Sequence, residues 1–227
     1  MRRGLSMAAE PRQRRLRAAG AAALLLASLW LAPLGPIPAR AEGLPRHYLG
    51  AGGLASRAGL DLAFWQDGSV SDPALDRKGR GWVVWAGLHL RPWLGLELSW
   101  LDLGRSRFSG VSDGLASIWL AGPVRGEAVM QGLALELLPR LPLGRWAALY
   151  LHGGLFAWDS SVRYRDALVG PLRVNRSGLS GVWGAGLELN LGPRWALRLQ
   201  AGRAGLGLAD LEFVQVDHAT AGLLRRL

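Results

Sequence analysis

Side chains that could carry out acyl-transfer chemistry are few in this sequence, and their spacing argues against catalysis. One Gly-x-Ser-x-Gly motif occurs, at 110–114. A serine nucleophile in this motif needs a strand before it and a helix after it, whereas the turn-rich residues around 110–114 predict neither. The serine would also need a histidine oriented by a carboxylate, and no histidine lies in a His-x-Ser arrangement: His47, His89, His152 and His218. We therefore expect no enzyme, with a lipid A-modifying enzyme as the residual alternative.

Neither a metal site nor a cofactor site is predicted. The chain has no cysteine, which excludes Cys-based metal or redox centres and a disulfide framework. The glycine-rich segment 50–53 falls within an expected strand and opens no helix, so a dinucleotide-binding fingerprint is rejected. Three aspartates between 67 and 76 could hold a cation, but we expect them to form a solvated acidic loop.

The first 41 residues have the pattern of a secretory signal peptide. An arginine-rich start is followed by an apolar run over 18–32 and by the small residues Ala39 and Ala41, which predict cleavage before Glu42. The apolar run is shorter than the roughly 20 residues that a spanning helix needs, which disfavours the alternative of an uncleaved anchor. Cleavage would lower the net charge from +10 to +4, because it removes seven arginines and one glutamate. No argument for nucleic-acid binding survives this correction.

Beyond Glu42, apolar residues alternate with small or polar ones, as in strands that have one apolar face. In the segment 94–100, for example, leucines and a tryptophan take the even positions. No run of about 18 uninterrupted apolar residues occurs there, although half of the chain is hydrophobic and its mean hydropathy is +0.15. The alternation predicts eight strands, at about 46–56, 80–91, 94–104, 127–138, 146–158, 179–191, 195–204 and 213–227.

The links between these strands are alternately long and short, as in bacterial outer-membrane barrels. The long links are 57–79, 105–126, 159–178 and 205–212, and the short ones are 92–93, 139–145 and 192–194. Both termini then lie on the side of the short turns, and the number of strands is even. We expect an all-β, eight-stranded, antiparallel, up-and-down transmembrane barrel over 42–227, with short turns periplasmic and long loops external.

Tryptophans occur at the expected strand ends, where a ring that is apolar but carries an N–H group suits a membrane–water interface. The predicted interfacial girdle consists of Trp93, Trp146 and Trp195 beside the short turns and of Trp82, Trp100 and Trp183 at the opposite ends. The alternative is a soluble barrel of the lipocalin kind, with tryptophans in its core and the rows of Glu97, Glu188 and Arg198 facing solvent.

Short segments of several strands resemble a known family. The segments 48–52, 96–104, 185–188 and 197–199 are similar to the first, third, sixth and seventh strands of the eight-stranded outer-membrane barrel of the OmpA type. The resemblance covers most of 46–227. It implies an outer-membrane location, contact with outer-membrane lipid and lipopolysaccharide, and insertion by the barrel-assembly machinery. We expect no peptidoglycan-binding domain.

An eight-stranded barrel is just wide enough to be filled by its own side chains, so inward charges must be paired. The resemblance implies an interior charge cluster with Glu97 and Glu188 near Arg198, and Glu136 where the family usually has lysine. Three carboxylates would then face one guanidinium, and three further side chains are candidates to compensate: His89, Arg91 and His152. The cluster could form a structural polar plug or line a narrow gated water path.

We therefore expect a bacterial outer-membrane barrel with a structural or surface-interaction role, without a cofactor and without nucleic-acid binding. Its long loops would contact an external ligand that the sequence does not identify. The alternatives are a narrow pore and a lipid A-modifying enzyme.

A barrel of this kind should be recovered with the outer membrane and should change its electrophoretic mobility on boiling, because a closed sheet resists detergent until it is heated. Cell fractionation followed by electrophoresis of boiled and unboiled samples measures both properties. A soluble protein with one heat-independent band would contradict the prediction.

Overall fold

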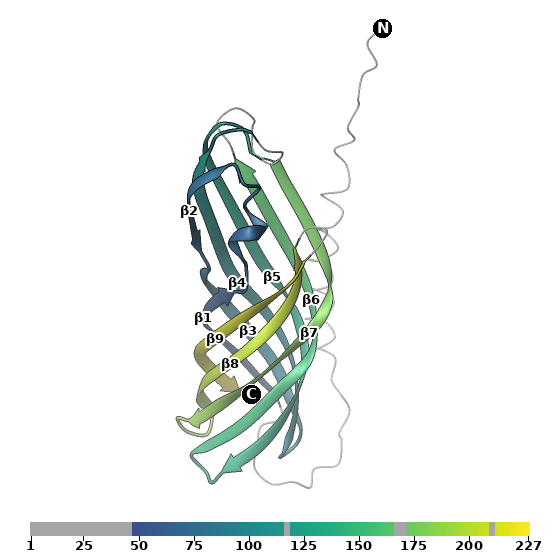
Figure 1. Ribbon diagram of the computed structural model, residues 1–227. Coiled ribbons are helices and arrows are strands. Elements are labelled where there is room, and N and C mark those ends of the chain that lie inside the picture. Colours follow the sequence, from purple (N-terminus) through teal and green to yellow (C-terminus); the bar gives the residue numbers. More distant parts are fainter. Residues whose placement is uncertain (1–46, 116–118, 166–171, 209–211) are drawn as a thin grey trace. The chain divides into compact units, whose positions relative to one another are not determined.

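The computed structural model describes residues 47–115, 119–165, 172–208 and 212–227 (Figure 1). The chain divides into two compact units, residues 1–43 and 44–227. The predicted signal peptide and its cleavage residues Ala39, Ala41 and Glu42 lie outside the described residues. In the described part of the chain, no helix is long and apolar enough to span a membrane.

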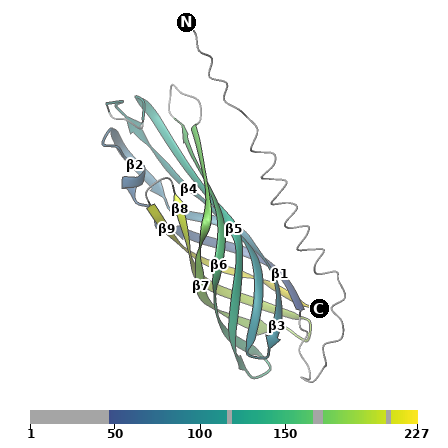
Figure 2. The same cartoon turned by 90° about the vertical axis from the view of Figure 1, so that its right-hand side faces the viewer.

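The described part of residues 44–227 is almost entirely β-structure. It contains one short 3-10 helix, η1 (Leu62–Phe64), and nine strands: β1 (His47–Ala58), β2 (Val70–Asp76), β3 (Lys78–Arg91), β4 (Leu94–Ser112), β5 (Gly122–Leu143), β6 (Ala147–Arg165), β7 (Leu172–Asn190), β8 (Trp195–Leu208) and β9 (Glu212–Arg226). Eight of them pair antiparallel in the order β4-β3-β1-β9-β8-β7-β6-β5, and β5 returns to β4. The sheet therefore closes into the predicted eight-stranded barrel, whose strands run obliquely around it (Figure 2).

The ninth strand, β2, lies within the predicted first long link and pairs with β4 above the point where β3 leaves it. Four predicted strands were also too short, because β4, β5, β6 and β7 continue well into the segments expected to be links. Inward positions in the upper extensions of β4, β5 and β6 are taken by serine, valine and phenylalanine, and outward positions by arginine. Their alternation therefore lacks the leucines that marked the other strands. On the side of the predicted long links, the described part of the barrel is therefore a tall sheet.

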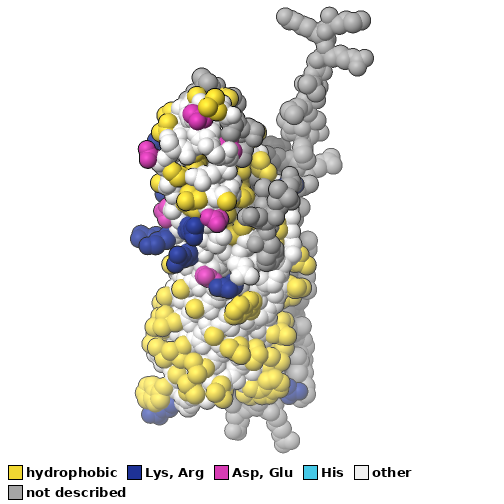
Figure 3. All heavy atoms as spheres, in the orientation of Figure 1, with side chains coloured by type: hydrophobic (Ala, Val, Ile, Leu, Met, Phe, Trp, Pro, Cys, Tyr) yellow, Lys and Arg dark blue, Asp and Glu magenta, His cyan; other side chains and the backbone are white. Residues whose placement is uncertain are grey.

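The polar face of the sheet points into the barrel and the leucine face points outward. Glu97, Glu188 and Arg198 are buried, whereas large apolar side chains such as Leu151 and Leu155 are more than half exposed. On the face shown in Figure 3, hydrophobic side chains cover most of the lower half, and charged side chains gather above them. The soluble-barrel alternative is therefore wrong, because it requires the opposite arrangement.

A β-bulge divides β4 into two parts that present opposite sets of residues to the lumen. Odd-numbered residues face inward up to Leu103, and even-numbered residues do so from Ser106 onward. The change occurs at Gly104, whose φ of 78° lies in the left-handed region that glycine adopts without strain. The pairing of β4 with β5 shifts its register at the same place. The bulge turns Arg105 and Arg107 outward and Phe108 inward.

Replacement of Gly104 should strain this bulge. In Gly104→Ala, the new Cβ would lie 2.6 Å from the carbonyl oxygen of Arg80, and we expect a loss of about 1–3 kcal/mol in the free energy of unfolding. The matched control is Gly53→Ala, because a Cβ at Gly53 meets nothing within 4 Å. Urea unfolding of the refolded barrel in detergent measures both. Equal stability of the two variants would contradict the strain.

Candidate functional site

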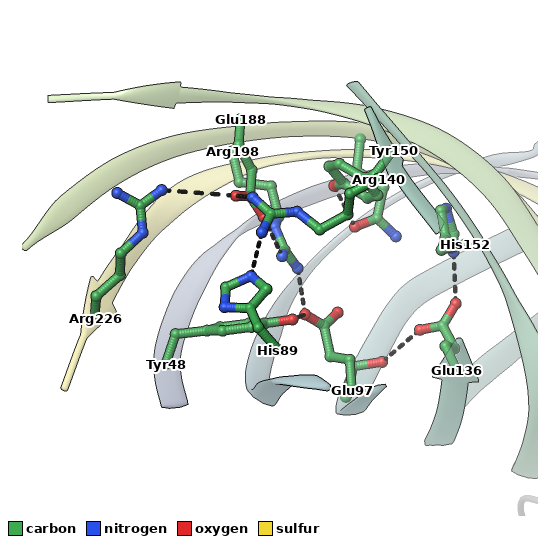
Figure 4. Close-up of polar contacts among 12 residues, drawn as sticks. Tyr48, His89, Glu97, Glu136, Arg140, Tyr150, His152, Glu188, Arg198 and Arg226 are labelled. Carbon is green, nitrogen blue, oxygen red and sulfur yellow. Dashed lines mark hydrogen bonds and ion pairs between the residues drawn. The ribbon is translucent and has the colours of Figure 1, made fainter. Parts of the chain in front are cut away.

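Arg198 lies at the centre of the lower lumen and is fully buried. Its strand, β8, places even-numbered residues inward, and the register sets Arg198 beside Glu188 on β7 and Gly222 on β9. Figure 4 shows Arg198 among the side chains of several strands.

Both ends of the Arg198 guanidinium donate to carboxylates. Its Nη1 lies 2.5 Å from Glu97 Oε2 and its Nη2 lies 2.6 Å from Glu188 Oε1. Three aromatic rings surround its Cζ atom, with centroids 5.0–5.3 Å away: Tyr150, Tyr48 and Trp85. Tyr48 Oη also donates to Glu97 at 2.5 Å. The buried cation is thus paired on its edges and covered by rings on its faces.

Two further arginines balance the carboxylates of the lumen. Arg140 Nη2 donates to Glu188 Oε2 at 2.5 Å, and Arg226 Nη2 lies 3.8 Å from the same oxygen. The expectation of three carboxylates facing one guanidinium was therefore wrong. Arg140 was missed because it falls in the predicted turn 139–145, whereas β5 continues to Leu143. The signal was present in the spacing, since Arg140 follows Glu136 by four residues and takes the same face.

Glu136 belongs to the lumen but does not contact Arg198. It stands opposite Glu97 in the register of β4 and β5. Its Oε1 accepts from His152 Nδ1 at 2.5 Å and its Oε2 accepts from Ser99 Oγ at 3.0 Å. Among the three candidates for compensation, His152 therefore partners Glu136, His89 contacts Arg140, and Arg91 is exposed.

Glycines on neighbouring strands make room for the large side chains of the lumen. Tyr48 lies over Gly87, its register partner on β3, and Tyr150 lies over Gly186 on β7. A Cβ at either glycine would come within 2.2 Å of the tyrosine ring. The tyrosines can therefore lie flat against the wall and fill the lumen without widening the barrel.

Aromatic side chains close the upper lumen. Trp65, which follows η1, is fully buried and stacks on Phe108 with a centroid distance of 5.6 Å. Trp119 Nε1 donates to the backbone oxygen of Trp65 at 2.8 Å, and Tyr164 packs against both tryptophans. Burial raises the pKa of Tyr164, which favours its neutral phenol. Sequence reasoning missed this cluster because Trp65 and Trp119 fall in predicted loops.

The tryptophans of the predicted girdle lie on the outer surface. Trp93, Trp146 and Trp195 are exposed beside the short turns. Trp82 and Trp183 are exposed farther along their strands, and Trp100 is half-buried. Their role at a membrane interface remains a prediction.

Basic side chains lie above the apolar part of the outer surface. A hollow of about 650 Å³ is lined by Lys78, Arg80, Arg105 and Arg107 together with Asp76. One of its arginines, Arg105, is paired with Glu127 at 3.1 Å. We call Arg57, Lys78, Arg80, Arg105 and Arg107 the basic ledge.

Farther up, β5, β6 and β7 set arginines directly opposite one another. Arg125 pairs in register with Arg165, and Arg163 pairs with Arg173. Like charges in directly opposed positions destabilise a sheet. We call these four residues the arginine pairs, and Arg125, Arg163 and Arg165 line a second hollow of about 500 Å³. Glu127 pairs in register with Arg163 and lines the same hollow, so a carboxylate partly balances these arginines.

The described ranges contain no group of three or more His, Asp or Glu side chains that converges as a metal site. The four residues of the predicted interior cluster are all buried in the lumen. Arg198 brings two of them together, Glu97 and Glu188, while Glu136 forms a separate pair with His152. The arrangement has the properties of a neutralised plug.

Comparisons with known proteins agree with this architecture. A family model described as the outer membrane protein beta-barrel domain matches residues 22–224. Neisserial surface protein A has a TM-score of 0.53 at 12% identity, over 80% of this chain and 97% of that chain. Ail, the attachment invasion locus protein of Yersinia pestis, has a TM-score of 0.51 at 17% identity, over 81% and 99%, in complex with the heparin analogue sucrose octasulfate. At these identities the two structures show similarity of fold alone. No curated protein matches the sequence.

Removal of the Arg198 side-chain charge should destabilise the barrel strongly. Arg198→Met leaves Glu97 and Glu188 facing each other without their shared partner, and breaking a buried pair costs about 3–5 kcal/mol. The control is Arg203→Met, which breaks an exposed 2.5 Å pair with Asp217 and should cost about 1 kcal/mol or less. Chemical unfolding in lipid vesicles compares the two variants. Losses of the same size would contradict a central role of Arg198.

Proposed function

Since this chain belongs to the outer membrane protein beta-barrel domain family, we propose that it is a closed, non-conducting surface barrel that binds anionic groups on its outer face. The observation that carries the proposal is the contrast between a neutralised lumen and an exterior where basic side chains outnumber the acidic ones beside them. The shared chemistry of the ligand is a phosphate or sulfate ester, from the lipopolysaccharide of the outer leaflet or from a sulfated polysaccharide.

Closure of the lumen supports a role other than conduction. The Arg198 network fills the lower lumen, and the cluster of Trp65, Phe108, Trp119 and Tyr164 fills the upper part. A narrow pore would need a continuous polar path through both of these layers. The alternative of a gated water path is therefore not favoured.

The positions of the chain ends support the orientation. Tyr48 near the start of β1 pairs with Arg226 at the end of β9, and both lie on the side of the short turns. In outer-membrane barrels this is the periplasmic side. The basic ledge and the arginine pairs then lie on the external side, above the apolar surface that faces lipid.

The basic side chains fit the proposed ligand in geometry as well as in sign. Arginine binds phosphate and sulfate oxygens through paired N–H groups, and four of the five side chains of the basic ledge line one hollow. A lipid phosphate at the membrane surface would meet the ledge first. The complex of Ail with sucrose octasulfate concerns a polysulfated sugar bound to a barrel of similar fold, and supports the second source of the same chemistry.

A catalytic role is not part of the proposal. Ser112, the serine of the Gly-x-Ser-x-Gly motif, is buried at the end of β4 and contacts Ser69 Oγ at 2.8 Å. Residues 113–115, which follow it, are not helical. We expect the protein to leave lipid A unmodified, and we expect the barrel-assembly machinery to insert it into the membrane.

Charge reversal on the basic ledge should weaken binding. For the double variant Lys78→Glu with Arg80→Glu, we expect a loss of about tenfold for each charge-assisted hydrogen bond removed, and a smaller loss at high salt. Binding of the refolded barrel to vesicles containing lipid A and, separately, to sucrose octasulfate distinguishes the two sources. Arg145→Glu, beside Trp146 at the short turns, is the matched control. Unchanged binding of both ligands by the ledge variant would contradict the proposed function, as would defined conductance steps of the wild type in planar bilayers.

A further inference from the structure

Two histidines inside the barrel are separated only by glycines. His152 on β6 pairs in register with Gly184 on β7, Gly184 pairs with Gly202 on β8, and Gly202 pairs with His218 on β9. All four positions face the lumen. The two imidazoles therefore approach one another along the inner wall, across two strands that present no side chain between them.

Each imidazole extends over the glycine beside it. A Cβ placed on Gly184 would lie 2.4 Å from His152 Nε2, and one placed on Gly202 would lie 2.9 Å from His218 Nε2. Cross-strand partners hold their Cβ positions about 4.5–5.5 Å apart. The two Nε2 atoms thus lie over neighbouring glycines on β7 and β8.

The hydrogen bonding of His152 prepares its Nε2 atom for a ligand. Its Nδ1 is bonded to Glu136 Oε1 at 2.5 Å, and Glu136 is held in turn by Ser99. When Nδ1–H donates to the carboxylate, the Nε2 atom of the neutral ring carries a free lone pair. The same carboxylate–histidine pairing orients the histidines of metal sites.

The facing nitrogens have no partner within the protein. The Nε2 atoms of His152 and His218 are buried and make no hydrogen bond, and neither does Thr220 Oγ1 at the next inward position of β9. Both histidines are more than nine-tenths buried. Buried polar atoms without a partner are costly, so the geometry requires something between the two rings.

We propose that His152 and His218 hold a transition-metal ion of the class that prefers imidazole, Zn²⁺ or Cu²⁺, between their Nε2 atoms. Metal–nitrogen bonds of about 2.0–2.1 Å place two nitrogens that share one ion at most about 4.2 Å apart, so the two rings move toward each other from their positions over the glycines when the ion binds. Glu136 is the orienting carboxylate, and water, within reach of Thr220, completes the coordination. Two protein ligands make this a site from which the ion can exchange. The proposal does not depend on the outer surface.

The test uses the full barrel, refolded without a polyhistidine tag in the presence of Zn²⁺ or Cu²⁺ and then desalted. We expect one metal ion per barrel by elemental analysis, and a Cu²⁺ spectrum in electron paramagnetic resonance with two imidazole nitrogens. His152→Phe and His218→Phe should each lose the bound metal or one nitrogen. Glu136→Gln should weaken the affinity about 10–100-fold while both nitrogens remain.

His47→Phe is the control, because His47 lies at the start of β1, outside the gap. Heat-modifiable migration of every variant shows that it has folded, which separates loss of the site from loss of the barrel. If the wild type retains no stoichiometric metal, or if both histidine variants keep the metal content and the two nitrogens of the wild type, the proposal is overturned and water occupies the gap.

Discussion

The barrel depends on a guanidinium that has been taken out of water. Arg198 can be buried only because Glu97 and Glu188 receive its N–H groups and aromatic rings cover its faces. These partners come from β1, β3, β4, β6 and β7, so the pairing is satisfied only when the distant strands have closed into a ring. The same requirement draws in Arg140 and Arg226, which share the second oxygen of Glu188. Closure and charge neutrality are thus one condition.

The wall of the barrel is shaped to make that condition achievable. Glycines at register positions opposite tyrosines and histidines let large rings lie flat, so that eight strands enclose a filled lumen instead of a channel. Trp65 and its neighbours repeat the arrangement higher up, where Trp65 lies over Gly126. The protein's own side chains therefore fill the lumen and balance its charges, and the unbalanced charge lies on the outer surface.

The alternation of apolar residues with small or polar ones predicted part of the structure. It predicted the eight strands of the ring, the short turns and the inward positions of Glu97, Glu188 and Arg198. It did not predict the full length of β4 to β7, because most of the added residues lack the regular alternation of leucine with small residues. Arg140 was missed because the predicted strand stopped at 138, although its spacing from Glu136 gave the parity, and Arg226 lies at the end of β9. Trp65 lies in the lumen because of a tertiary contact with Phe108, and the local spacing of residues does not predict such a contact.

The bulge at Gly104 determines which residues face the lumen in the part of β4 that follows it. If the alternation continued unbroken through that residue, Arg105 and Arg107 would enter the lumen, and Phe108 would turn to the surface. The bulge thus separates a lower part of β4, which faces a polar interior, from an upper part, which faces an aromatic interior. A single-residue insertion or deletion at the bulge would exchange the inward and outward residues of the upper part of β4. The chemistry of the outer surface and the closure of the upper lumen therefore depend on each other.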